Sequence, residues 1–388
     1  MRNDPLKIVY CTPSLYIPGG VERVLTLKAN YFVEHFGYDI TIILTDGKDK
    51  PNAFPLSPKI NVLNLDINFE ELWGCSFIMK ILLYLKKQRS YKRRLTKELL
   101  RIRPDITDSL LRREINFITK IPDGSKKIGE LHVSKYNFRT FKDNETNFVK
   151  EIFSWFWRKS NLRCLKRLDK FIVLTAEDKK LWNELNNVIA IPNPISFQIP
   201  RISDLNNKRV LAVGRYDYVK GYDMLLKAWA IVEKDCLDWS LVIFGAGNRE
   251  PYEILIKKLH IDSNRCHICG STENIQEEYI KSTVFVVSSR YEGLSMAMLE
   301  AMSCGLPVVS FACPCGPKDL ICNGENGILV PRENVEKLAE SLKCLMNSPQ
   351  DIQRMGKKAL MRTNDYKIDV IAHKWKSLFE ALLLCDNN

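Results

Sequence analysis

The stretch Ser288-Ser289-Arg290-Tyr291-Glu292-Gly293-Leu294-Ser295-Met296-Ala297-Met298-Leu299-Glu300 decides the fold of this 388-residue chain. It follows an apolar run at 284–287, which is typical of a strand buried on both faces. It then opens a predicted helix, with Ser295 as the expected cap. Gly305 suits the left-handed residue that ends a helix, and the apolar run 308–311 predicts the next strand. Strand, turn, helix and strand in this order indicate a parallel α/β sheet.

Two carboxylates flank the start of this predicted helix. Glu292 lies in the turn after the strand, and Glu300 follows about two helical turns later. Ligands of open parallel sheets bind outside the carboxyl ends of the strands. The free N–H groups at a helix N-terminus suit a phosphate. The stretch therefore indicates a site for a sugar nucleotide.

Strand and helix signals alternate through both halves of the chain. In the first half, apolar runs predict strands at 7–11, 39–45, 60–65, 105–110, 127–133, 170–175 and 188–191, with a long helical region over 70–102. Pro192-Asn193-Pro194 interrupts this order, and it restarts with a predicted strand at 210–213. The chain is long enough for two cores, so we expect two doubly wound α/β domains.

The net charge of +12 lies entirely in the first half: residues 1–196 hold 34 basic and 22 acidic side chains, and the remainder holds 24 of each. The segment 77–103 begins with an apolar run and carries ten basic residues and one acidic residue, Glu98. Such a helix can lie in an anionic membrane interface. A core-facing helix with a solvated basic face explains much of the same pattern. Nucleic acid is the competing partner, but no RNA or DNA motif accompanies the patch.

The N-terminus enters a predicted strand at Lys7, so we expect no signal peptide. The apolar runs are too short for a transmembrane helix. The twelve scattered cysteines are typical of cytosolic thiols. Cys266-x-x-Cys269 and Cys313-Pro314-Cys315 offer half-sites for zinc, but neither has a second pair at metal-like spacing, so we expect no metal.

Two glycine-rich turns of the second half follow predicted strands. Gly214 to Gly221 contains Arg215 and Lys220, which can bind phosphate oxygens. The alternative interpretation is that Arg215 and Lys220 are solvated surface cations. Their position at a predicted cleft favours phosphate binding over this alternative. Gly245-Ala246-Gly247 lacks the third glycine of a dinucleotide motif, because Glu250 stands there, but these glycines could border a nucleotide.

Two features of the first half are weaker evidence for a binding site when each is taken alone. Gly19-Gly20-Val21-Glu22-Arg23 follows the first strand, where glycines let the backbone approach a ligand; a simple tight turn is the alternative. His132 ends a predicted strand and could hydrogen-bond a substrate group, and a purely structural histidine is the alternative.

Together these motifs resemble retaining glycosyltransferase family 4. The resemblance lies in Glu292-x7-Glu300 with its context, and in the order of the glycine-rich turns and the Ile191-Pro192-Asn193-Pro194 segment. It implies a GT-B fold: two Rossmann-like doubly wound parallel-sheet domains facing a central cleft. It also implies acceptor binding by residues 1–195, nucleotide-sugar binding by 196–365, and a C-terminal helix in 366–388 that crosses back to the first domain.

The resemblance also implies roles for individual residues. Glu300 would hold the ribose hydroxyls, Glu292 would contact the hydroxyls of the donor sugar, and Arg215 and Lys220 would neutralise the departing diphosphate. His132 would lie near the transferred sugar. The donor would be lined by Gly19, Gly20, Gly214, Gly245, Gly293, Leu294, Ser295 and Met296.

The expected function is retaining transfer of a hexose-type sugar from a nucleotide sugar, with UDP as the default, to a growing glycan or lipid-linked acceptor in cell-surface polysaccharide biosynthesis, such as capsule or lipopolysaccharide. The absence of an Asp-x-Asp pair agrees with metal-independent chemistry without a cofactor. The expected location is the cytoplasm, with peripheral contact to the cytoplasmic face of the membrane. The alternatives are a nucleotide-sugar epimerase or phosphorylase of the same fold, and a catalytically silent glycan- or membrane-binding homologue.

Overall fold

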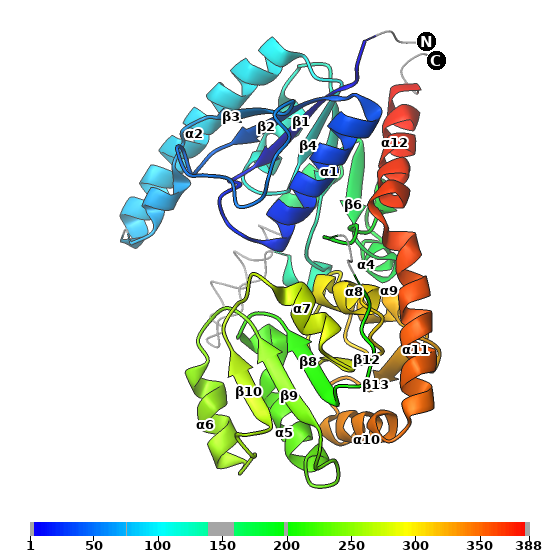
Figure 1. Cartoon of the computed structure of the whole chain (residues 1–388). Helices are drawn as coiled ribbons and strands as arrows, with labels where there is room; N and C mark the ends of the chain where they lie inside the picture. The colour runs from blue at the N-terminus through cyan, green and yellow to red at the C-terminus, as the bar shows by residue number, and fades with distance from the viewer. Residues whose placement is uncertain (1–3, 75, 139–158, 198–200, 385–388) are drawn as a thin grey trace. The chain divides into compact units, whose positions relative to one another are not determined.

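The computed structural model describes residues 4–74, 76–138, 159–197 and 201–384. The chain forms two compact units, each around its own sheet (Figure 1). Unit 1 consists of Met1–Leu174, Lys179–Ile191 and Ile368–Asn388, and unit 2 consists of Thr175–Asp178 and Pro192–Lys367.

The sheet of unit 1 has seven strands in the order β3-β2-β1-β4-β5-β6-β7, and all neighbours are parallel. The strands are β1 (Lys7–Thr12), β2 (Asp39–Leu44), β3 (Asn61–Asn64), β4 (Ile106–Ser109), β5 (Lys126–Glu130), β6 (Lys170–Val173) and β7 (Val188–Ala190). The order reverses between β1 and β4, as in doubly wound nucleotide-binding sheets.

Helices cover both faces of this sheet. They include α1 (Gly20–Phe36), α2 (Phe77–Ile102), α12 (Ile368–Leu384) and the 3-10 helices η1 (Phe69–Leu72), η2 (Glu114–Asn116) and η3 (Ile118–Lys120). The chain also forms η4 (Lys135–Asn137) and α4 (Ala176–Leu181), and the residues of α4 are divided between the two units after Asp178. Alternate residues of β1 point to opposite faces: Val9 and Cys11 pack with the core under α2, and Ile8 and Tyr10 pack with the core under α1 and α12. Both faces are therefore buried, which explains the continuous apolar runs.

Unit 2 repeats the same plan with six parallel strands in the order β10-β9-β8-β11-β12-β13. The strands are β8 (Arg209–Val213), β9 (Ser240–Phe244), β10 (Cys266–Cys269), β11 (Val284–Val287), β12 (Val308–Phe311) and β13 (Gly327–Val330). The helices are α5 (Tyr222–Val232), α6 (Glu250–Lys258), α7 (Ile275–Ile280), α8 (Met296–Ser303), α9 (Pro317–Leu320), α10 (Val335–Met346), α11 (Pro349–Arg362) and the 3-10 helices η5 (Tyr218–Lys220) and η6 (Thr363–Tyr366).

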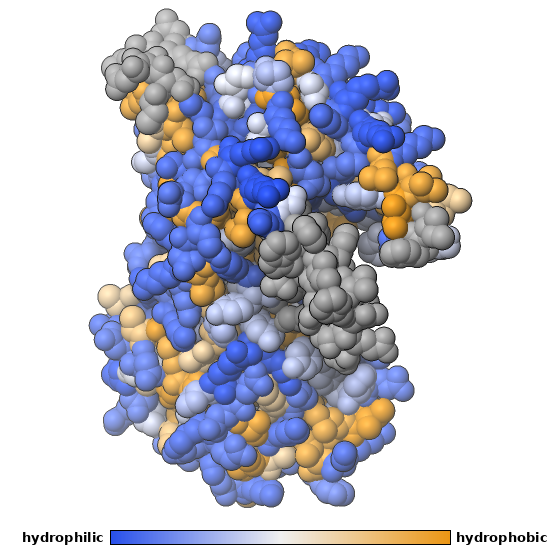
Figure 2. Space-filling model, turned by 180° about the vertical axis from the view of Figure 1, so that it is seen from behind, coloured by the Kyte–Doolittle hydropathy of each residue, from blue (hydrophilic) through white to orange (hydrophobic). Residues whose placement is uncertain are grey.

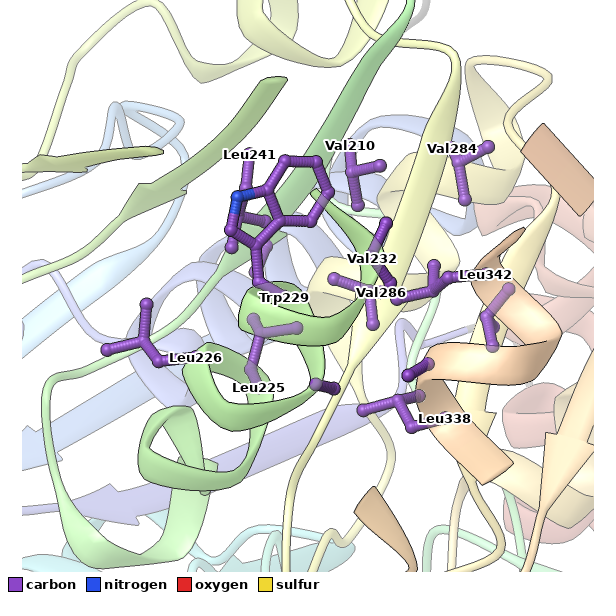
Figure 3. Close-up of a cluster of buried hydrophobic side chains, with 14 of the residues drawn as sticks. Val210, Leu225, Leu226, Trp229, Val232, Leu241, Val284, Val286, Leu338 and Leu342 are labelled. Carbon is purple, nitrogen blue, oxygen red and sulfur yellow. The ribbon is translucent and has the colours of Figure 1, made fainter. Parts of the chain in front are cut away.

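The main core of unit 2 fills the space between α5, α10 and the sheet. Figure 3 shows Trp229 of α5 beside side chains of β8, β9, β11 and α10. Trp229, Leu225 and Leu342 are fully buried. This packing fixes the strands whose carboxyl ends carry the candidate site.

The structure corrects three local predictions. The predicted helix 70–102 is broken after η1, and Gly74 has φ 91°, which no helical residue adopts; α2 begins at Phe77. β5 ends at Glu130, so His132 lies two residues beyond the strand rather than at its end. Ser295 stands at the N-cap of α8, but its side chain makes no capping hydrogen bond. In the described ranges, no helix is long and apolar enough to cross a bilayer.

Candidate active site

The carboxyl edge of the unit 2 sheet carries most of the residues singled out in the sequence. The chain leaves β8 toward β9 on one side of the sheet and leaves β11 toward β12 on the other. The space beyond the ends of β8 and β11 is therefore a topological switch point, where ligands of such sheets bind. Residues 214–220 follow β8, and residues 288–292 follow β11.

Lys220 and Glu292 form an ion pair at this switch point. Lys220 Nζ lies 2.8 Å from Glu292 Oε1, and Ser289 Oγ donates to the same oxygen at 2.6 Å. The side chains of Lys220 and Glu292 are only 20% and 8% exposed. Ser288 Oγ also donates to the carbonyl oxygen of Lys220 at 2.8 Å, which ties the turn after β11 to η5. A cation suited to phosphate thus stands beside a carboxylate suited to sugar hydroxyls.

Arg290 and Asp223 strengthen the same connection and were missed by sequence reasoning. The Arg290 guanidinium donates to both oxygens of Asp223, at 2.8 and 2.7 Å, and to the carbonyl oxygen of Tyr218 at 2.8 Å. It also lies 4.0 Å from the centre of the Tyr218 ring. Burial by itself raises the pKa of Asp223, but the hydrogen bonds and charge of Arg290 outweigh it and lower the pKa. A planar bidentate pair of this kind fixes the turn that carries Glu292.

Arg215 is placed differently from Lys220. Its side chain is 76% exposed, and its guanidinium lies 3.0 Å from Asp217 Oδ2. The structure therefore pairs Glu292 with Lys220 and pairs Arg215 with Asp217 on the surface. A phosphate role for Arg215 stays a prediction.

Gly214 and Gly245 directly follow the neighbouring strands β8 and β9, and neither position has room for a side chain. A Cβ atom on Gly245 would lie 1.9 Å from the carbonyl oxygen of Gly214. A Cβ atom on Gly214 would lie 2.9 Å from Cε of Lys220. These glycines allow the two strand ends to approach each other and leave room for the Lys220 side chain.

Replacing Gly245 with alanine should destabilise unit 2 by about 1–3 kcal/mol, because the added methyl group overlaps backbone rather than a flexible side chain. Urea unfolding measures the change. Gly270→Ala is the matched control: Gly270 directly follows β10, and its nearest neighbour to a Cβ is Arg249 Nη1 at 3.9 Å, an ordinary contact. Equal unfolding midpoints for the two variants would contradict the role given to Gly245.

The turn between Glu292 and α8 brings backbone groups to the same edge. Leu294 and Ser295 are buried, whereas Gly293 and Met296 are partly exposed. Gly316, with φ 87°, packs against the turn; a Cβ there would lie 3.0 Å from the carbonyl oxygen of Gly293. The first N–H groups of a helix lack acceptors inside the helix, so the start of α8 can offer donors to an anion.

Glu300 lies further along α8, inside unit 2. Tyr279 donates its hydroxyl to Glu300 Oε2 at 3.0 Å, and Ser196 hydrogen-bonds Oε1. The Glu300 residue is 6% exposed. Neither partner was predicted. Ser196 is 104 residues away from Glu300 in the sequence, and the local sequence does not distinguish Tyr279 from an ordinary aromatic core residue. The two hydroxyls hold the carboxylate in a fixed orientation.

Unit 1 contains a cavity of about 740 Å³ at the carboxyl ends of its strands. Its wall includes residues that follow β1, β4 and β5, among them Tyr16, Arg112 and His132. Gly19 and Gly20 precede Val21 and Glu22, which also line it. The Glu22 side chain folds back over Gly19, where a Cβ would lie 2.3 Å from Oε2. The cavity combines carboxylates, cations and aromatic rings, a mixture suited to a polar ligand with an apolar face.

His132 is 7% exposed as a side chain, and its Nε2 lies 3.4 Å from Glu130 Oε2. Neither ring nitrogen has a hydrogen-bond partner among the described residues. Glu130 Oε1 in turn hydrogen-bonds the ammonium group of Lys28. The structure thus places His132 on the cavity wall, at the end of a buried chain of charged groups.

The cysteines of the proposed half-sites are free thiols. Burial raises the pKa of both Cys266 and Cys313 to about 12, so both remain protonated near neutral pH. Over the described ranges, no three His, Cys, Asp or Glu side chains are grouped as metal ligands.

Known proteins similar to this chain include several that are named as glycosyltransferases. The family model described as "Glycosyl transferases group 1" matches residues 197–362. A Haemophilus influenzae protein named as an uncharacterized glycosyltransferase is 36% identical over 54% of this chain and 61% of its own length. The Erwinia amylovora amylovoran biosynthesis glycosyltransferase AmsD is 33% identical over 59% of this chain and 67% of its own length. The chain thus spans about two thirds of these two relatives.

Other similarities extend over nearly the whole chain. A Campylobacter jejuni α-1,4-N-acetyl-D-galactosaminyltransferase, named as acting on a diphosphate-undecaprenol-linked saccharide, is 27% identical over 93% of this chain and 94% of its own length. The structure of a Thermosynechococcus elongatus sucrose-phosphate synthase superposes with a TM-score of 0.80, covering 98% of this chain and all of that one at 16% identity. A structure of Staphylococcus aureus TarM described as a complex with UDP has a TM-score of 0.74, covering 96% of this chain and all of that one at 16% identity. These superpositions establish the GT-B fold of two Rossmann-like domains.

Proposed function

The chain belongs to the group 1 glycosyl transferases, and from this membership we propose that it moves a hexose-type sugar from a nucleotide-sugar donor to a growing glycan or lipid-linked saccharide. We propose UDP as the nucleotide and retention of the anomeric configuration as the outcome. The observation that carries the proposal is the Lys220–Glu292 pair at the switch point of unit 2. UDP in the TarM complex and the lipid-linked saccharide in the name of the Campylobacter relative support the donor and acceptor classes.

Each proposed role follows from the charge that develops during transfer. When the bond between the sugar and the diphosphate breaks, negative charge grows on the diphosphate. Lys220, Arg215 and the amides at the start of α8 would stabilise that charge, and Glu292 would hold hydroxyls of the sugar. Glu300 would bind the ribose. Two hydroxyl-binding carboxylates need no acid/base role, so the two-carboxylate mechanism of glycosidases does not apply.

The proposal is tested by incubating the full-length protein with a panel of UDP-, GDP- and ADP-sugars and measuring nucleotide release and sugar transfer. Release of one nucleotide, unchanged in EDTA, is the expected result. Interconversion of free sugar nucleotides without release would instead identify an epimerase. Failure of every donor to bind or react would favour a catalytically silent homologue.

We also propose that α2 contacts an anionic membrane surface, which would place the protein on the cytoplasmic face. Its first turns expose the apolar side chains Met79, Ile81, Leu82 and Leu85, which are 51%, 45%, 59% and 49% exposed. Figure 2 shows this apolar surface on the protruding part of unit 1. Exposed lysines and arginines continue along the helix, at 80, 86, 89, 92, 93, 94, 97 and 101. Each cation near an anionic surface contributes about 1 kcal/mol at physiological ionic strength.

Vesicles of phosphatidylglycerol and phosphatidylcholine should therefore bind the protein at low salt and release most of it near 1 M salt, where the screening length falls to about 3 Å. Leu82→Ser with Leu85→Ser should weaken binding by about tenfold, since two exposed leucines leave the interface. Co-sedimentation measures both effects. Leu100→Ser is the matched control, because Leu100 is 45% exposed near the other end of the helix. Binding that is absent, or equally strong at high salt, would contradict this surface.

A further inference from the structure

Three ionisable side chains are buried together in the interior of unit 1. Lys28 of α1, Asp108 of β4 and Glu130 of β5 are 2%, 0% and 3% exposed. Asp108 of β4 is paired with Tyr10 of β1 in the parallel sheet. It therefore lies on the same face as Tyr10, which is the face covered by α1 and α12. This cluster lies outside the motifs that indicated the function.

Stability alone does not account for the cluster. Moving a charged group from water into a protein interior costs several kcal/mol per ion, and apolar replacements of buried pairs are often neutral or stabilising. The structure nevertheless encloses the Lys28 ammonium completely, 4.0 Å from the centre of the Trp375 ring and 5.2 Å from that of Tyr10. Both rings and the Glu130 carboxylate hold this charge in one place.

The pKa values of the two carboxyl groups in the cluster shift in opposite directions. Burial raises the pKa of Asp108 well above its usual range, and the neighbouring Glu130 raises it further. Burial also raises the pKa of Glu130, but Lys28 and then His132 outweigh that effect and lower it. These shifts favour the neutral form of Asp108 and the charged form of Glu130, whose carboxylate hydrogen-bonds Lys28.

Glu130 connects this interior pair to the cavity. One of its oxygens, Oε1, is held by Lys28, while Oε2 lies 3.4 Å from His132 Nε2. The His132 side chain forms part of the cavity wall, and its two nitrogens have no hydrogen-bond partner among the described residues. Among the described residues, Glu130 is thus a charged group that can fix how this imidazole is oriented.

We propose that Glu130, anchored by Lys28, is a positioning residue for His132. In this arrangement Nε2 carries the proton and faces Oε2 at 3.4 Å, and the carboxylate charge sets the tautomer and the ring orientation at the cavity wall. The catalytic part of this inference rests on the proposed sugar transfer; the tautomer itself does not. Lys28 holds the Glu130 carboxylate in place, so that this carboxylate neither rotates away from His132 nor takes up a proton.

The kinetic test is a double-mutant cycle in the full-length protein. Glu130→Gln combined with Lys28→Met removes both charges, so neither variant side chain leaves a buried ion unpaired. This double variant should lower kcat for sugar transfer about 10- to 100-fold with the donor KM within about twofold, because a misplaced catalytic group costs rate rather than binding. In a His132→Ala background the same two changes should lower kcat less than about twofold further. An equal loss in both backgrounds would overturn the proposal.

A second buried pair of the same unit supplies the matched control. Lys127 Nζ lies 2.5 Å from Asp123 Oδ1, with side chains 7% and 0% exposed, at the amino end of β5. Lys127→Met with Asp123→Asn removes an equivalent pair that does not contact His132. It should change thermal stability to a similar degree and leave kcat within about twofold. A loss of kcat as large as that of the Glu130 variant would show that buried charge affects rate only through stability.

The tautomer is measured without any reaction. Nitrogen-15 spectra of histidine-labelled protein, with His132→Asn used to assign the signal, should show the Nε2–H form in the wild type and a mixture of tautomers in the Lys28/Glu130 variant. An unchanged tautomer would overturn the proposal. If the wild type transfers no sugar from any donor, the proposed function fails, and this spectrum still decides the role of Glu130.

Discussion

Replacing Lys220 with methionine should lower the rate of sugar transfer by about 10²–10³-fold, the usual loss when a preorganised group that stabilises a leaving anion is removed. The ammonium lies 2.8 Å from Glu292 at the switch point of unit 2, so it is held before the donor arrives. Lys220→Arg should recover part of the loss because it keeps the charge. Initial rates at saturating donor measure the effect.

The Lys220→Met change leaves Glu292 without its paired cation, so the folding of the variant must be measured alongside its rate. Glu292 still accepts from Ser289, which limits the structural cost. Circular dichroism should show a cooperative transition for Lys220→Met, and Lys337→Met, an exposed lysine on α10, should retain full rate. A rate equal to that of the Lys337 control would exclude Lys220 from the stabilisation of the leaving group.

Replacing Glu300 with alanine should weaken nucleotide binding by about 10- to 100-fold, since a hydrogen bond to a charged group contributes about 1.5–3 kcal/mol. Titration calorimetry with UDP measures the loss. The discriminating ligand is 2′-deoxy-UDP. The wild type should bind it more weakly than UDP, and Glu300→Ala should bind the two almost equally.

This comparison separates ribose binding from a structural role. Glu300 also receives hydrogen bonds from Tyr279 and Ser196, so its loss disturbs both side chains. A structural disturbance lowers affinity for both nucleotides by the same factor. Preserved preference for UDP in the alanine variant would therefore rule out contact between Glu300 and the ribose.

Sequence patterns were sufficient to predict both sheets because their parallel strands are buried on two faces. Runs such as Val284–Val287 and Asp39–Leu44 contain few polar residues, so their positions are unambiguous. The break before α2 was missed although Gly74 was a visible signal in the sequence. Strand ends are also less certain than strand centres, which explains the misplacement of His132 relative to β5.

The sequence predicted individual residues of the candidate site within each local motif, but it did not predict the contacts between motifs. Glu292 and Lys220 were identified separately, and the structure shows that they form a pair. Contacts such as Arg290 with Asp223 join residues 67 positions apart, and nothing in either local segment specifies the partner. A lysine within the apolar stripe of α1, at Lys28, was one signal of the buried cluster that the sequence offered.

Helix α12 has a consequence for how the chain is made. Ile371, Trp375 and Phe379 belong to the core that also contains Ile8 and Phe32. During synthesis, Ile371 emerges from the ribosome after the whole of Pro192–Lys367, a delay on the order of ten seconds at about 5–20 residues per second. Translation of unit 1 therefore begins before that of unit 2 but is completed after it. Until then the apolar surface of α1 is open, and it is the part of the nascent protein that a chaperone would need to shield.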